Sequence, residues 1–171
     1  MIIEGSIIKY DRENINTDEI IPARYLNTSD PDQLASHCME DLDGEFIKKM
    51  EELNAKIMVT GGNMGCGSSR EHAPIAIKYA GIKAVIAPSY ARIFFRNSIN
   101  TGLAIFECKD PDFYQDVKTG MNLKIFANDG ELEILETGKK FKIQKMPPFL
   151  QEIIKTGGLV SFAKGILNQQ K

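Results

Sequence analysis

The spacing of apolar positions changes along the chain and predicts different structures in its two parts. In the first part, short apolar runs bounded by glycine, proline or polar turns are typical of buried strands. Three such runs occupy residues 55–61, 84–88 and 103–108, and residues 2–10 predict a strand before them. One helical stretch ends near residue 80, with Gly81 as its C-cap. A second helix should cover residues 90–100, capped by Ser89 and closed by Gly102. This alternation of strands and helices predicts an α/β layer.

The last third of the chain follows another pattern. Segments 121–127, 131–136 and 140–145 predict a β-meander. Asn-Asp-Gly at 128–130 is typical of a hairpin between its first two strands. Pro147-Pro148 then breaks the chain, and residues 149–170 predict terminal helices separated by a Gly-Gly hinge.

The connection after the first strand, residues 11–30, is rich in turn residues and long for a loop, so we expect it to be functional or mobile. Asp30 and Pro31 predict the N-cap and first position of a helix over 31–42. A weaker helix should follow over 44–53. The whole chain, residues 1–171, is expected to form one domain with a mixed sheet and flanking helices.

The charge balance narrows the classes of function. Hydrophobic residues make up 43% of the chain and charged residues 26%, with a formal net charge of −2. Without a broad basic field, a nucleic-acid or anionic-membrane partner is disfavoured, and anion binding must come from a local site. The N-terminus does not resemble a signal peptide, and no apolar run is long enough to span a bilayer.

The three cysteines, Cys38, Cys66 and Cys108, are odd in number and far apart in the sequence. This spacing argues against a disulfide framework and for a reducing cytoplasm. It also argues against an iron–sulfur or zinc site formed by this chain alone, because such sites need clustered ligands. We expect Cys38 and Cys108 to be small buried hydrophobes and Cys66 to fill a turn.

Candidate chemistry gathers in GGNMGCGSSREHAP, residues 61–74. Gly62 and Gly67 have the glycine spacing of a Walker A loop, but Ser68 stands where its lysine must be. Gly65 and Gly67 begin a dinucleotide fingerprint, but Arg70 occupies the third glycine position. The Gly-x-Ser-x-Gly elbow of the α/β-hydrolases is absent.

The remaining features of this loop favour an anion site. Glycines after a strand let backbone N–H groups approach a ligand, and Arg70 adds a bidentate donor for a carboxylate or phosphate. Ser68 and Glu71 match a capping box. However, Pro74 would then lie inside the helix, so the regular helix is expected to start a turn later and to leave Ser68 on an irregular lip. Two plainer alternatives remain: Ser68 is only an N-cap, and Arg70 is only a surface charge.

A serine-protease mechanism is disfavoured, although His72 lies four residues after Ser68. The base of a catalytic triad normally comes from elsewhere in the fold. His37 lies in an apolar helix pattern, so we expect it to be structural.

Several motifs together resemble a known family. GCGSSREHAPIAIKYAG at 65–81, followed by SYARIFFRN at 89–97, is similar to the swivelling β/β/α domain of the aconitase superfamily. Residues 11–41 resemble the start of bacterial 3-isopropylmalate dehydratase small subunits. The motifs fall in the family's order over nearly the whole chain. The resemblance implies a heterodimer in which a large subunit carries a [4Fe–4S] cluster.

The same resemblance implies roles for the loop. Ser68 matches the catalytic base, which takes a proton from the carbon next to the departing hydroxyl. Ser69 and Arg70 match the groups that hold a substrate carboxylate. The implied substrate is a small hydroxy dicarboxylate. The implied reaction is the isomerisation of 2-isopropylmalate and 3-isopropylmalate through isopropylmaleate, in leucine biosynthesis. A stabilised alkoxide is needed for a serine to act as a base, and a positive helix end, close amides and Arg70 would stabilise it.

The segment ARYLNT, residues 23–28, matches the family loop that meets the variable end of the substrate. In the family, an arginine just after Tyr-Leu goes with an extra substrate carboxylate. Here Asn27 and Thr28 are neutral, which favours an uncharged branch. They could instead be simple turn residues. Related hydro-lyases, such as homoaconitase or dimethylmalate dehydratase, and a non-catalytic anion-binding domain remain alternatives.

Overall fold

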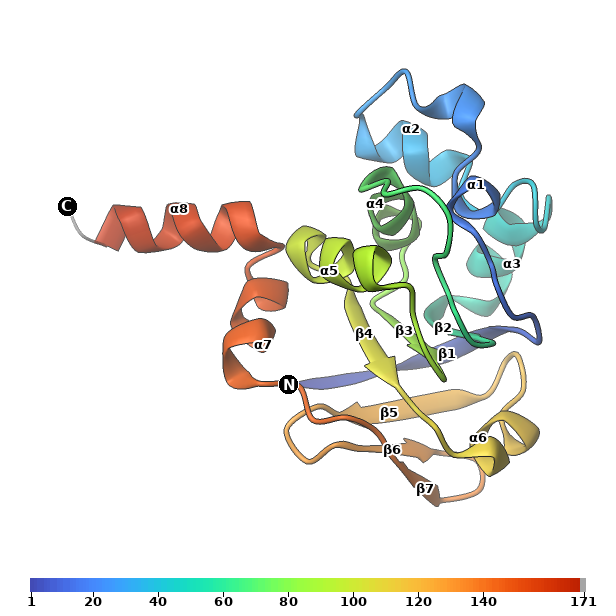
Figure 1. The fold of residues 1–171 in the computed structure, drawn as a ribbon. Helices are drawn as coiled ribbons and strands as arrows, with labels where there is room; N and C mark the ends of the chain where they lie inside the picture. Colours follow the sequence, from blue (N-terminus) through green and yellow to red (C-terminus); the bar gives the residue numbers. More distant parts are fainter. Residues whose placement is uncertain (170–171) are drawn as a thin grey trace.

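The computed structural model describes residues 1–169 and is built around one seven-stranded mixed sheet (Figure 1). The strands are β1 Ile2–Tyr10, β2 Ala55–Thr60, β3 Ala84–Ala87, β4 Ala104–Glu107, β5 Asn122–Phe126, β6 Glu131–Ile134 and β7 Lys139–Lys142. Their order in the sheet is β4-β3-β2-β1-β5-β6-β7. The first four strands are parallel, and β5 to β7 are antiparallel. The α/β class, the mixed sheet and the meander are therefore confirmed.

The helices flank this sheet (Figure 1). They are α1 Thr17–Ile20, the 3-10 turn η1 Ala23–Tyr25, α2 Pro31–Ser36, α3 Phe46–Leu53, α4 His72–Tyr79, α5 Arg92–Thr101, α6 Pro111–Asp116, α7 Pro148–Lys155 and α8 Leu159–Gln169. Helices α1 to α5 cover one face of the parallel strands, whereas α6 lies beside the meander. The predicted terminal helix extends to residue 170, which lies outside the described residues.

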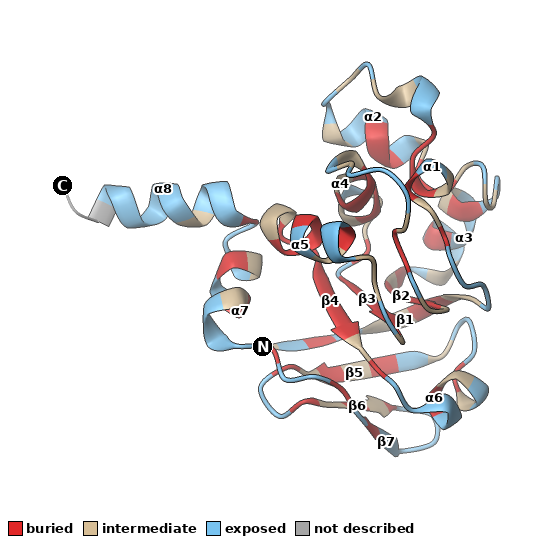
Figure 2. Cartoon of the chain, in the orientation of Figure 1, coloured by how far each residue is buried: buried red, intermediate tan, exposed pale blue. Residues whose placement is uncertain are grey.

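The parallel strands are buried on both faces because their alternate side chains point to two separate apolar clusters (Figure 2). On β2, Met58 belongs to the apolar cluster formed with the helices on one face of the sheet, while Ile57 and Val59 belong to the cluster shared with the meander and α6. All three side chains are fully buried. This two-sided burial explains why β2 to β4 consist mainly of apolar residues in the sequence.

Local signals placed several helix ends correctly. Asp30 caps α2, because its carboxylate accepts a hydrogen bond from the backbone N–H of Asp32 at 3.0 Å. Pro31 is the first residue of α2, although the helix ends at Ser36 and not near residue 42 as predicted. Gly102 ends α5 in a left-handed conformation, with φ of 82°.

Two local predictions were wrong or incomplete. Ser89 does not cap α5, which begins at Arg92 after the uncapped Ala91. Instead, the Ser89 hydroxyl accepts a hydrogen bond of 2.9 Å from the backbone N–H of Asn63, so it links two loops. Helix α6 was missed, although its Asp-Pro start repeats the signal that identified α2.

Two of the three cysteines are confirmed as buried hydrophobes. Cys38 and Cys108 are 1% and 0% exposed. Burial raises the pKa of each thiol. None of the helices in residues 1–169 is long and apolar enough to cross a membrane.

Candidate functional site

Three loops meet at the edge of the sheet where β1, β2 and β3 end. Because these strands are parallel and adjacent, the loops that follow them leave from the same edge, which is where ligands bind in open α/β sheets. Backbone hydrogen bonds connect the loops. The N–H of Thr17 donates to Cys66 at 2.8 Å, and the N–H of Ala91 donates to Met64 at 3.0 Å. The GCG loop, residues 61–71, is thus held between two neighbouring loops.

Gly65 and Gly67 of the GCG loop combine a positive φ with little room for a side chain. Gly65 has φ of +77°, and a Cβ there would lie 2.5 Å from the Cβ of buried Phe94 and closer still to its ring. Gly67 has φ of +100°, and its Cβ would lie 3.2 Å from the Thr17 hydroxyl. The loop therefore packs backbone directly against α1 and α5, as expected of glycines that need close approach.

Ser68 lies on an irregular lip before α4, as Pro74 had indicated. Helix α4 begins at His72, and the side chain of its N-cap residue, Glu71, makes no capping hydrogen bond. The capping box in this region is instead formed by Asn16 and Glu19 at α1. The hydroxyl of Ser68 lies 3.3 Å from the hydroxyl of the buried Thr17, whose oxygen is also 3.2 Å from the Ser68 carbonyl. Ser68 is therefore exposed but fixed by α1.

Ser69 and Arg70 follow on the same lip. Ser69 is exposed. The Arg70 guanidinium pairs with the carboxylate of Asp18 on α1, and this ion pair sets the direction of the long side chain. Within residues 1–169, the backbone N–H groups of Gly67, Ser68 and Ser69 donate to no protein acceptor. Hydroxyls, free N–H groups and a guanidinium together are suited to an anion.

Asn27 and Thr28 lie in the segment between η1 and α2. Asn27 is exposed, and the Thr28 hydroxyl accepts a hydrogen bond of 3.1 Å from the backbone N–H of Asp30. Helix α2 packs against α4, so this segment and the Ser68 lip lead into neighbouring helices. No hydrogen bond within the described residues joins Asn27 or Thr28 to Ser68–Arg70. The structure shows Thr28 in a turn before α2, and its contact with a substrate stays a prediction.

Two further arginines adjoin the GCG loop and were not singled out in the sequence. Arg92 and Arg96 lie one turn apart on α5 and line an open hollow of about 690 Å³ together with Gly65 and Gly67. Both arginines are exposed and form no ion pair with the described residues, whereas the other three arginines of the chain are all paired. Their spacing of four residues within a predicted helix places both side chains on one face, and this spacing could have identified them in the sequence.

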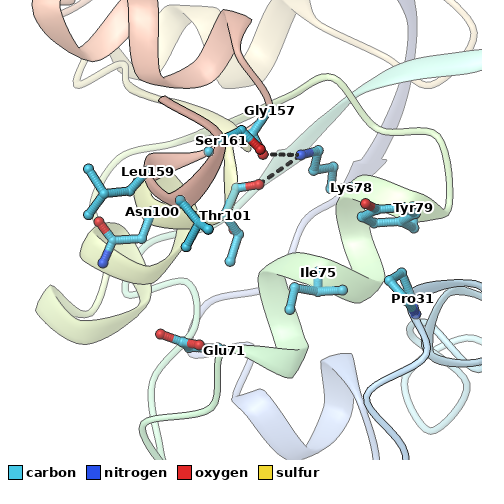
Figure 3. A pocket seen from close by; sticks show the side chains of 12 residues that line it. Pro31, Glu71, Ile75, Lys78, Tyr79, Asn100, Thr101, Gly157, Leu159 and Ser161 are labelled. Atoms are coloured by element: carbon cyan, nitrogen blue, oxygen red, sulfur yellow. Dashed lines mark hydrogen bonds between the residues drawn. The ribbon is translucent and has the colours of Figure 1, made fainter. Parts of the chain in front are cut away.

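A second hollow, of about 350 Å³, lies between α4, α5 and the start of α8 (Figure 3). The ammonium of Lys78 donates to the carbonyls of Thr101 at 2.8 Å and Gly157 at 3.0 Å. The Thr101 carbonyl lies at the C-terminal end of α5, where a cation is favourable, and the Gly157 carbonyl lies in the turn that follows α7. Partial burial lowers the pKa of Lys78. We therefore interpret Lys78 as a structural cap of two helices.

Cys66 occupies the turn between Gly65 and Gly67, and its thiol donates to the carbonyl of Asn14 at 3.4 Å. No group of three or more His, Cys, Asp and Glu side chains in residues 1–169 is arranged to hold a metal ion. With Cys38 and Cys108 buried far from this loop in sequence, the three thiols do not form the clustered set that an iron–sulfur cluster needs.

The comparisons with known proteins agree with this geometry. Residues 2–111 match the family model described as the aconitase C-terminal domain. The chain is 52% identical to the 3-isopropylmalate dehydratase small subunit of Caldicellulosiruptor bescii, over 99% of both chains. It is 52% identical to the protein of the same name from Thermodesulfovibrio yellowstonii, over 99% of this chain and 98% of the relative.

A solved structure of 3-isopropylmalate dehydratase from Methanocaldococcus jannaschii has a TM-score of 0.87 to this chain. It is 44% identical, and the match covers 99% of this chain and 98% of that one. The fold and the edge of the sheet that holds the GCG loop define an aconitase-type domain. The chain belongs to the aconitase C-terminal domain family and, within it, to the 3-isopropylmalate dehydratase small subunits.

Proposed function

We propose that this chain is the small subunit of an enzyme that interconverts 2-isopropylmalate and 3-isopropylmalate through isopropylmaleate. In this role the chain acts as one swivelling domain in cytoplasmic leucine biosynthesis. The main support is the full-length similarity to proteins of that name, together with an exposed Ser68 held at the ligand-binding edge of the sheet.

Ser68 is proposed as the catalytic base, which removes a proton from the carbon next to the departing hydroxyl. An alkoxide at this position would be stabilised by groups already in place. The Thr17 hydroxyl, which donates to the Ser68 carbonyl in this structure, lies 3.3 Å from Ser68 Oγ and could turn its hydrogen towards an alkoxide there. Arg70, fixed by Asp18, supplies positive charge on the same lip. Preorganised donors of this kind lower the free energy of a developing negative charge.

The substrate is proposed to be a hydroxy dicarboxylate with one carboxylate at Ser69 and Arg70. A planar guanidinium can form two parallel hydrogen bonds with a carboxylate, and the free N–H groups of the loop add further donors. Asn27 and Thr28 are proposed to meet the variable end of the substrate. Because neither is a cation, a third carboxylate would be poorly held there.

A large subunit is proposed to cover the GCG loop and the hollow lined by Arg92 and Arg96. Those arginines are unpaired within residues 1–169 and lie beside Gly65 and Gly67, so acidic groups of the large subunit could pair with them. The thiols of this chain do not fit an iron–sulfur cluster, and we assign the [4Fe–4S] cluster to the large subunit. Its open iron would supply a Lewis acid for the hydroxyl group.

The test is to combine the chain anaerobically with the large subunit, iron and sulfide. Isopropylmaleate absorbance is then followed after 3-isopropylmalate is added. We expect activity only when both chains are present. If an intact cluster gives no activity, a panel of related hydroxy acids comes next. Failure of the whole panel would contradict the proposal and favour a non-catalytic anion-binding domain.

A further inference from the structure

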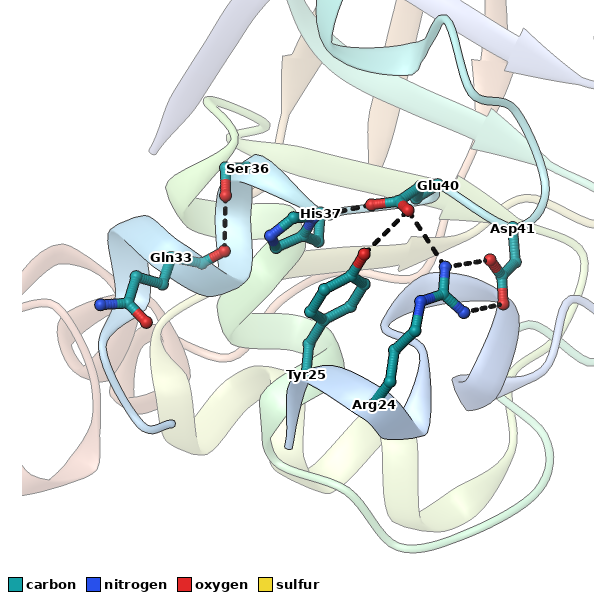
Figure 4. A network of polar contacts seen from close by, with 7 residues as sticks. All are labelled: Arg24, Tyr25, Gln33, Ser36, His37, Glu40 and Asp41. Carbon is teal, nitrogen blue, oxygen red and sulfur yellow. Dashed lines mark hydrogen bonds and ion pairs between the residues drawn. The ribbon is translucent and has the colours of Figure 1, made fainter. Parts of the chain in front are cut away.

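Five polar side chains join the ARYLNT segment to the chain that follows α2 (Figure 4). Arg24 donates to both oxygens of Asp41, at 2.6 and 3.1 Å, and to Glu40 at 3.0 Å. The Tyr25 hydroxyl donates to Glu40 at 2.9 Å. His37 Nδ1 lies 2.7 Å from the other oxygen of Glu40, and its ring stacks on Tyr25 with centroids 3.6 Å apart. We call these five residues the loop clamp.

Glu40 is the centre of the loop clamp because three side chains converge on its carboxylate. The hydrogen bond from His37 and those from Tyr25 and Arg24 hold the pKa of Glu40 below its usual range. Glu40 is therefore ionised at neutral pH, and both of its carboxylate oxygens are in hydrogen bonds. Arg24 similarly lowers the pKa of Asp41.

The anchor point of the loop clamp is fixed to the core. Met39, next to Glu40, is completely buried and adopts φ of +62°. Its backbone N–H donates to the carbonyl of Ile20 at the end of α1, at 2.8 Å. Glu40 therefore extends from a rigid position, whereas Arg24 and Tyr25 belong to the short 3-10 turn that leads directly into Leu26, Asn27 and Thr28.

Few other contacts hold the segment in place. The side chains of Tyr25 and Leu26 pack partly on the apolar core. The Thr28 hydroxyl bonds only to the nearby N–H of Asp30 within the described residues. A single exposed ion pair contributes little to stability, but a bidentate arginine in a network of several groups contributes more.

We propose that Glu40 is a positioning residue, which holds the ARYLNT segment in the conformation that presents Asn27 and Thr28 to the substrate. The inference rests on the proposed function for its catalytic consequence. Its structural consequence, the fixed conformation of the ARYLNT segment, can be tested with this chain alone. Glu40 touches no reacting atom, so its loss should loosen substrate binding and leave the proton transfer at Ser68 intact.

The structural test measures backbone hydrogen exchange in the isolated chain at Tyr25 and Leu26, whose N–H groups donate to Pro22 and Ala23. Glu40→Gln keeps the shape of the side chain and removes its charge, and Glu40→Ala removes all three contacts. Loss of the network should speed exchange at these two amides by about 3–10-fold. Glu52→Gln, on the exposed face of α3, is the matched control and should change nothing. Exchange that is unchanged in both Glu40 variants would overturn the proposal.

The kinetic test uses the same variants with the large subunit. Glu40→Gln should raise KM for isopropylmalate by about 3–10-fold, with kcat within about twofold of the wild type. An unchanged KM in an active enzyme would overturn the positioning role. No turnover by the wild-type pair would instead count against the proposed function, and the exchange comparison would still decide on Glu40.

Discussion

Gly65→Ala provides a sharp test of how the GCG loop is positioned. Gly65 has φ of +77°, a conformation that disfavours a Cβ by about 1–2 kcal/mol. The added methyl would also lie 2.5 Å from the Cβ of Phe94. Phe94 is only 2% exposed, so it cannot rotate away freely, and overpacking of this kind destabilises by about 1–3 kcal/mol. We expect the free energy of unfolding to fall by about 2–5 kcal/mol.

The assay is urea unfolding of the isolated chain, followed by far-UV circular dichroism. With a slope of about 2 kcal/mol/M, the unfolding midpoint should fall by about 1–2.5 M. Gly62→Ala is the matched control in the same loop. Gly62 does not have a positive φ, and its Cβ would meet only the Ser89 hydroxyl at 3.3 Å. We expect the control to change the midpoint much less. A Gly65→Ala midpoint within error of the wild type would refute the packing described for the loop.

Three other experiments test separate parts of the account. Reversing Arg92 and Arg96 to glutamate should weaken association with the large subunit by about tenfold or more, measured by calorimetry, whereas Lys83→Glu at the opposite edge of the sheet should not. If the Arg92/Arg96 variant bound the large subunit as tightly as the wild type does, the hollow would not be part of the interface. Asn27→Arg should slow turnover of isopropylmalate and admit a tricarboxylate, and unchanged kinetics on both would exclude this segment from specificity. Lys78→Met should lower the free energy of unfolding by about 1–2 kcal/mol, because two helix-end carbonyls lose a charged donor; an unchanged urea midpoint would contradict that role.

The sequence predicted those parts of the fold that depend on local chemistry. Buried strands were recognised by short apolar runs, and α2 by an Asp-Pro start. Pro74 correctly indicated that α4 begins after Ser68. In each case the preference of a few adjacent residues determines the local backbone, so tertiary contacts were not needed to predict it.

Features that depend on contacts between distant segments were not predicted. The pairing of β1 with β2 brings residues 14–18 against the GCG loop, and nothing in either segment alone reveals that Thr17 meets Ser68. Ser89 was assigned as a cap because its hydroxyl suits that role, but a neighbouring loop uses the hydroxyl instead. In the loop clamp, Arg24 and Tyr25 likewise bond to carboxylates 15 to 17 positions further along the chain.

The most direct test of the central claim compares wild-type and Ser68→Ala chains, each assembled with the large subunit and an intact cluster. The rate of isopropylmaleate formation from 3-isopropylmalate is measured, and assembly is checked by size-exclusion chromatography. If Ser68 is the base, the variant should assemble normally and lose turnover by about 10²–10⁴-fold. Near-normal turnover by a fully assembled Ser68→Ala enzyme would contradict the account.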